Sequence, residues 1–387
     1  MKKYIQLFMI ALRLGCTSFG GPTAHLGYFY DEYVKRRQWL TDAEYTHLVA
    51  LCQFLPGPAS SQVGFGIGVA KAGLIGGIIS FIGFTLPSVL ILMIFAGLLH
   101  VSGMDMKWIT GLKIVAVAIV LNAILGMAQK LLPDVKTKLF ALFTLVVTLL
   151  VAHPASQVIA LTLVGVAGLI VFKDIPFEAS KVRLFHIRKS VGIFSLILFF
   201  LLLSVLPILS ALTQSTWMMM IDKFYRSGAL VFGGGHVVLP LLKDAFVNSN
   251  MIASDDFITG YALAQAVPGP LFTFATYIGT VMSGWLGGIV ATLAIFLPAF
   301  LLLVGVLPFW EQVQNNQNMR KVLKGVSAGV VGILIAAFYN PIVTASVHSR
   351  IDFVFAAVLF VLLTYCKVPS WAIVILGIIG GILLYSL

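Results

Sequence analysis

Residues 53–61 read Gln53-Phe54-Leu55-Pro56-Gly57-Pro58-Ala59-Ser60-Ser61, and this stretch interrupts an apolar run that would otherwise form one membrane helix. Proline lacks a backbone N–H and its ring clashes with the preceding turn, so two prolines around a glycine should end the helix. A new helix then begins at Pro58, where the first N–H groups lack partners and the helix dipole is positive. Because Ser60 and Ser61 add two hydroxyl donors, the stretch predicts an anion site at membrane depth.

The composition sets the fold class. The chain has 387 residues, of which 60% are hydrophobic and only 10% are charged. This balance predicts an all-α polytopic membrane protein, embedded in a lipid bilayer. The net charge of +11 does not indicate nucleic acid as a partner, because basic patches with interleaved aromatic residues are absent from the sequence. Positive charge in cytoplasmic loops explains it better. A homodimer is left open.

The break at 53–61 has a counterpart at Gln265-Ala266-Val267-Pro268-Gly269-Pro270, and other landmarks recur with it. Residues of the first half recur in the same order and at nearly constant spacing in the second half. Arg13, Gly15, Phe19, Gly20, Gly21 and Asp31 recur as Arg226, Gly228, Phe232, Gly233, Gly234 and Asp244. Gly76, Gly77 and Pro87 recur as Gly287, Gly288 and Pro298. The chain therefore contains an internal repeat. Paired breaks in the two halves of a membrane protein point to a transporter binding site.

The repeat and the charges predict the domain organisation. We expect an N-terminal repeat at 1–172, a cytoplasmic basic linker with one unpaired span at 173–212, and a C-terminal repeat at 213–387. One unpaired span would insert the second repeat in the opposite orientation. The charges agree, because the basic residues 35–37 correspond to the uncharged residues 248–250. We therefore expect two inverted-topology repeats, with Met1 and the linker cytoplasmic and Leu387 external.

The expected helices include half-length pieces. Residues 4–38 and 44–73 are interpreted as re-entrant hairpins, because a full crossing by residues 4–19 would place the basic residues 35–37 outside. The second hairpin would consist of pieces at 44–55 and 58–73. Further spans are expected at 76–100, 107–131, 138–152, 155–172 and 190–211.

Substrate-binding candidates follow from the breaks. Glycines there would let a ligand approach the backbone closely, and arginine's planar fork suits an oxyanion. The candidates are Arg13, Gly20, Gly21, Gln53, Gly57, Ser60, Ser61, Arg226, Gly233, Gly234, Gln265 and Gly269. Simple helix kinks are the alternative for the breaks, although four breaks at repeat-related positions favour a ligand site. For Arg13 and Arg226, snorkelling to the interface is equally open.

Ionisable residues provide candidates for ion coupling. Asp31 matches Asp244 in the repeat, and Glu44 matches Asp256. Carboxylates inside a membrane protein can carry protons. For Glu44 and Asp256 we favour helix capping, because Thr41 and Ser254 precede them as at helix starts. His25 is also a candidate, and a hydrogen-bonded structural role is favoured over a proton relay.

Other classes of function find less support in the sequence. It contains no HExxH, GxSxG or P-loop motif and no clustered Cys/His set, so we expect no enzyme, no catalytic residues, no metal and no cofactor. Composition leaves an intramembrane protease open, but symmetric breaks do not supply an asymmetric nucleophile–base pair. A channel is also open, although alternating access requires two related halves more directly than a pore does.

Several of these stretches together carry a family resemblance. Residues 19–25 (Phe-Gly-Gly-Pro-Thr-Ala-His), 39–40 and 52–62 resemble the signature blocks of the chromate ion transporter family, and residues 232–236 and 265–270 resemble its C-terminal repeat. The resemblance covers nearly the whole chain. It implies the long two-domain form with oppositely oriented halves, which exports chromate across the cytoplasmic membrane. It leaves open chromate, sulfate or another dianion as substrate, because a nest of helix N-termini and arginine would bind any tetrahedral dianion.

Overall fold

The computed structural model describes residues 2–18, 21–101, 107–151, 156–173, 187–231, 238–310, 316–344 and 346–386, and all regular elements in these ranges are helices. Five helical stretches are long and apolar enough to cross a membrane: Ala59–Leu98, Thr110–Gln129, Lys189–Thr213, Leu271–Phe309 and Gln317–Asn340. The chain is therefore an all-α polytopic membrane protein, as its composition predicts.

The helices form two compact units. Unit 1 comprises Met1–Ser102, Ser180–Val238 and Val267–Glu311, and unit 2 comprises Gly103–Ala179, Leu239–Ala266 and Gln312–Leu387. Each unit takes segments from both predicted repeats. The boundary between the predicted repeats therefore does not coincide with the boundary between the two packed units.

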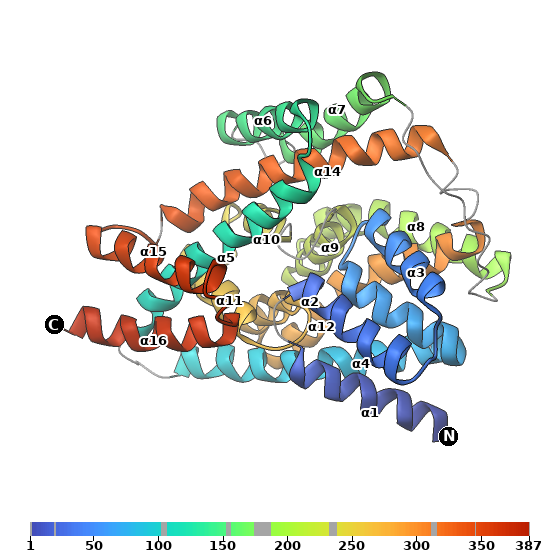
Figure 1. Cartoon of the computed structure of the whole chain (residues 1–387), viewed down its shortest axis with the longest axis horizontal. Helices are drawn as coiled ribbons and strands as arrows, with labels where there is room; N and C mark the ends of the chain where they lie inside the picture. Colours follow the sequence, from blue (N-terminus) through green and yellow to red (C-terminus); the bar gives the residue numbers. More distant parts are fainter. Residues whose placement is uncertain are drawn as a thin grey trace. The chain divides into compact units, whose positions relative to one another are not determined.

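Unit 1 is built on two long apolar helices, α4 and α12. Its elements are α1 (Lys2–Thr17), α2 (Gly21–Phe29), the π-helix η1 (Tyr30–Arg36), α3 (Asp42–Phe54), α4 (Ala59–Val101), α8 (Lys189–Thr213), α9 (Thr216–Leu230), the 3-10 turns η4 (Leu271–Thr273) and η5 (Leu307–Phe309), and α12 (Phe274–Val306). Helix α1 lies along α4, and α9 packs on α12 (Figure 1). The two contacts are repeat-equivalent, because Gly15 abuts the Phe84 carbonyl and Gly228 abuts the Ile295 carbonyl.

Both α4 and α12 reverse direction and form helical hairpins. The Ser80 hydroxyl donates to the Gly64 carbonyl at 2.8 Å, although residues this far apart lie about 24 Å apart on a straight helix. The reversal occurs at Ala72 and Gly73, where Gly73 adopts φ +70°. Helix α12 reverses in the same way at Ser283 and Gly284. The predicted division into pieces at 58–73 and 76–100 is therefore confirmed.

Unit 2 groups helices around α14 and α5. Its elements are α5 (Lys107–Leu131), α6 (Val135–Leu150), α7 (Ser156–Val171), the π-helices η3 (Lys243–Val247) and η6 (Phe338–Val343), α11 (Ser254–Ala266), α14 (Gln317–Ala337), α15 (Arg350–Thr364) and α16 (Ser370–Ser386). The short α10 (Val238–Leu242) leads into η3. Helix α14 packs on α6 and α7, and α5 packs on α11, α15 and α16. Glycine lets these helices pack closely. A Cβ added at Gly332 would lie 1.9 Å from the Ala141 carbonyl oxygen, and one added at Gly111 would lie 1.9 Å from the Gly377 carbonyl oxygen.

Candidate functional site at the two breaks of unit 1

The first break has a backbone that only glycine adopts easily. Helix α3 ends at Phe54, Gly57 has φ +121°, and α4 begins at Ala59. A Cβ added at Gly57 would lie 2.5 Å from the Ala299 Cβ of α12. The Gln62 side chain closes the break, because its Nε2 donates to the carbonyls of Pro56 and Ala299, at 3.1 Å each. The helix ends where the prolines predict.

The second break repeats this geometry in the other half. Gly269 has φ +110°, and a Cβ added there would lie 2.9 Å from the Ser88 hydroxyl of α4. Since Ser88 and Ala299 occupy equivalent repeat positions, each break packs against the long arm of the opposite hairpin. The backbone at Gly57 and the backbone at Gly269 thus have equivalent packing partners.

Two hydrogen bonds join the breaks reciprocally. The Gly57 N–H donates to the Val231 carbonyl at 2.7 Å, and the Gly269 N–H donates to the Ser18 carbonyl at 3.0 Å. Ser18 and Val231 are repeat equivalents, and each directly follows its helix, α1 or α9. The break of each half therefore pairs with the other half. It also follows that these two N–H groups are engaged by protein and are not free for a ligand.

A buried histidine links the two breaks. The His25 side chain is fully buried, with Nε2 at 3.2 Å from the Ser18 carbonyl and Nδ1 at 3.4 Å from the Ser60 hydroxyl. A carbonyl can only accept, so Nε2 carries the proton and Nδ1 accepts from Ser60. The Ser18 carbonyl accepts from His25 and Gly269 together. This hydrogen bonding agrees with the structural role favoured for His25.

Unpartnered polar atoms lie around these contacts. Ser18 Oγ, Ser61 Oγ, Gln62 Oε1 and Thr85 Oγ1 are buried and have no hydrogen-bond partner among the residues that the structure describes. Their residues are at most 3% exposed. Leaving a buried hydroxyl unpaired costs about 1–3 kcal/mol. The three hydroxyls could donate to a ligand with several acceptor oxygens, whereas Gln62 Oε1 can only accept and would need a donor.

Both candidate arginines are paired with carboxylates. Arg13 Nη2 lies 2.5 Å from Glu32 Oε2, and Arg37 Nε donates to Glu32 Oε1 at 2.6 Å. Arg226 binds Asp222 one turn earlier on α9 through both carboxylate oxygens. Burial acts to raise the pKa of Glu32, but Arg37 and Arg13 outweigh it and hold that pKa below its usual value. Each arginine is therefore already bound to a carboxylate of its own half.

The carboxylate partners Glu32 and Asp222 are absent from the residues predicted for the site. Both are buried, at 5% and 2% exposed, although they are charged. The Asp222–Arg226 spacing is a readable signal, because residues four apart face each other on a helix. The Glu32–Arg13 pair joins η1 to α1 and has no local signal.

The remaining candidates belong to other elements or lie outside the described residues. Gly20, Gly233 and Gly234 are outside the described ranges, whereas Gly21, with φ +76°, begins α2. Gln53 is exposed, and Asp31 forms an exposed ion pair with Lys35. Gln265, Asp244 and Asp256 belong to unit 2.

The expected capping is confirmed for Glu44. Its carboxylate accepts from the Thr41 N–H at 2.8 Å, while the Thr41 hydroxyl accepts from the Glu44 N–H. Asp256 lies in the first turn of α11. Among the described residues, no group of three or more His, Cys, Asp or Glu side chains could hold a metal ion.

Similarity to known proteins extends over both halves of the chain. The family model described as chromate transporter matches residues 5–171 and 217–382. An uncharacterized transporter of Methanocaldococcus jannaschii is 27% identical over 98% of this chain and 94% of its own length. Chromate transport proteins of Cupriavidus metallidurans and Pseudomonas aeruginosa are 28% and 25% identical, each over 86% of this chain and over 81% and 79% of their own lengths. No solved structure matches. The chain belongs to the chromate transporter family.

Proposed function

We propose that this chain is a secondary transporter that exports chromate across the cytoplasmic membrane and so confers chromate resistance. The observation that carries the proposal is the similarity to two chromate transport proteins over 86% of the chain. The two broken hairpins support it, since discontinuous helices form the substrate sites of many transporters.

We place the substrate at the first break of unit 1. The N-terminus of α4 supplies backbone N–H groups and a positive dipole end. The unpartnered hydroxyls of Ser18, Ser61 and Thr85 supply further donors. Chromate offers four acceptor oxygens for them. Arg13 and Arg226 are not assigned a contact with chromate, because they are paired with Glu32 and Asp222.

We further propose that the repeats have inverted topology and alternate in access. The reciprocal bonds Gly57–Val231 and Gly269–Ser18 support a two-fold relation between the halves. Helix α8, which has no counterpart in the first half, would reverse the second. Cysteines introduced in the linker 173–189 and beside Leu387 should react with membrane-impermeant reagents from opposite sides. Reaction of both from the same side would contradict the topology.

Transport itself is tested in everted membrane vesicles. We expect them to take up labelled chromate, since this direction corresponds to export, and we expect a proton gradient to accelerate uptake. Vesicles without the protein are the control. Uptake of sulfate but not chromate would assign another dianion as substrate. Chromate flux that responds to no gradient of a second ion would favour an anion channel.

A further inference from the structure

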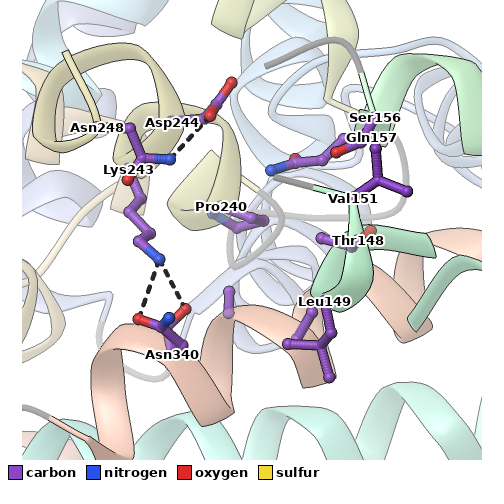
Figure 2. A pocket seen from close by; sticks show the side chains of 12 residues that line it. Thr148, Leu149, Val151, Ser156, Gln157, Pro240, Lys243, Asp244, Asn248 and Asn340 are labelled. Atoms are coloured by element: carbon purple, nitrogen blue, oxygen red, sulfur yellow. Dashed lines mark hydrogen bonds between the residues drawn. The ribbon is translucent and has the colours of Figure 1, made fainter. Parts of the chain in front are cut away.

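Unit 2 contains a polar cavity of about 520 Å³ that the proposed function does not use. Lys243, Asp244 and Asn248 line it from η3 and the turn that follows, Thr148 from α6 and Gln157 from α7. Asn340 of η6 also lines it. Figure 2 shows Lys243, Asp244 and Asn248 on one side, with Gln157 and Thr148 opposite them. Three stretches of the chain, 148–157, 240–248 and 336–340, thus bring amide, hydroxyl, ammonium and carboxylate groups to one cavity.

The ammonium group gives the cavity an anion-binding element. Lys243 Nζ donates to the carbonyl and to Oδ1 of Asn340, at 3.0 and 3.3 Å. An ammonium group has three hydrogens, so one remains for a ligand. Burial lowers the pKa of Lys243, and the neighbouring Asp244 opposes that effect. A partly desolvated cation gains more from a bound anion than a fully exposed lysine would.

The cavity also contains acceptors that need a donor. Gln157 is 9% exposed, and its Oε1 has no partner among the described residues; the same holds for Thr148 Oγ1. Asp244 Oδ1 accepts from Asn248 Nδ2 at 2.9 Å, and a carboxylate has capacity for further donors. A carboxylate repels a fully deprotonated dianion, but it accepts a hydrogen bond from an anion that carries an O–H.

We propose that this cavity binds a small tetrahedral oxyanion that carries one proton, with Lys243 balancing its charge and the Asp244 carboxylate accepting its O–H. Chromate and phosphate both exist partly as hydrogen anions near neutral pH, whereas sulfate is fully deprotonated. The cavity would therefore separate chromate and phosphate from sulfate, which have the same shape. This site is separate from the substrate site proposed at the break in unit 1.

The test is equilibrium binding of labelled phosphate and labelled sulfate to the purified full-length protein in detergent at neutral pH. Wild type should bind phosphate saturably and prefer it to sulfate. Lys243→Met should weaken phosphate binding at least about tenfold, because it removes a hydrogen bond to a charged group. Lys243→Arg, which keeps the charge, should retain most of the binding. Lys136→Met, at an exposed lysine of the same unit, is the matched control.

Asp244→Asn gives the sharpest result, because it has nearly the same shape but replaces an acceptor oxygen with a donor. It should weaken phosphate binding and strengthen sulfate binding, so the preference should reverse. A change of both affinities in the same direction, or of neither, would overturn the proposal. So would the absence of saturable phosphate binding to wild type. Chromate transport in vesicles is measured separately, so failure of this site and failure of the proposed function are distinguishable.

Discussion

The two breaks of unit 1 have the same backbone but different side chains around it. Gly57 and Gly269 both adopt positive φ, and each donates its N–H to the other half. Several polar residues of the first half have apolar counterparts in the second: His25 corresponds to Val238, Ser60 to Phe272, Gln62 to Phe274 and Thr85 to Phe296. The repeat has thus kept its backbone geometry, while these polar side chains occur in the first half alone. This difference favours one oxyanion site over two.

Leucine at either glycine should have the largest effect, because it tests the shared scaffold. Gly57→Leu and Gly269→Leu each add a side chain where φ is positive and where a Cβ would already crowd Ala299 or Ser88. We expect both variants to lose chromate transport in vesicles while the protein remains in the membrane. Transport rate and protein level are measured together.

A compensating change separates crowding from backbone strain. Ala299→Gly removes the atom that lies 2.5 Å from the added Cβ, so it should partly restore Gly57→Ala but not Gly269→Ala. Wild-type affinity and rate in both leucine variants would show that the breaks are simple kinks.

Substitutions at Ser61 and Thr273 test the difference between the two breaks, and we expect their effects to be intermediate in size. These residues are repeat equivalents, but Ser61 Oγ is unpartnered among the described residues, whereas the Thr273 hydroxyl donates to the Pro270 carbonyl at 2.7 Å. Ser61→Ala should weaken chromate binding by about 1 kcal/mol without loss of stability. Thr273→Val should lower stability by about 1 kcal/mol without loss of affinity. Binding isotherms and thermal unfolding in detergent measure the two quantities, and equal behaviour of the two variants would refute the asymmetry.

Lysine at the two arginines should have the smallest effect on transport. Arg13→Lys keeps a cation beside Glu32, which still binds Arg37, so transport and stability should change little. Arg226→Lys loses the two-point contact with Asp222 and should be the more destabilising of the two, by roughly 1 kcal/mol. Unfolding temperatures and chromate affinity are compared at equal protein concentration. A large loss of affinity in Arg13→Lys with unchanged stability would instead show that Arg13 contacts the substrate.

Local sequence rules predicted much of this fold. Pro56 and Pro58 end one helix and begin the next, and the bounds of α5 agree with the predicted span at 107–131. These features depend on neighbouring residues and on helical length. The Glu32–Arg13 pair depends instead on how η1 packs against α1, and the cavity around Lys243 depends on three stretches that are far apart in the chain. Neither leaves a periodic pattern, so sequence reasoning could name Asp244 but not its surroundings.

The reciprocal hydrogen bonds between the breaks also affect when the first half can finish folding during synthesis. When the first half leaves the ribosome, the Gly57 N–H lacks its partner, the Val231 carbonyl, which has not yet been translated, whereas the Ser18 carbonyl already has His25 as a donor. An unpaired backbone group is costly in an environment that excludes water. The hairpin of the first half is therefore expected to remain incompletely packed until the second half is inserted, and the two halves should be stable only when they are made together.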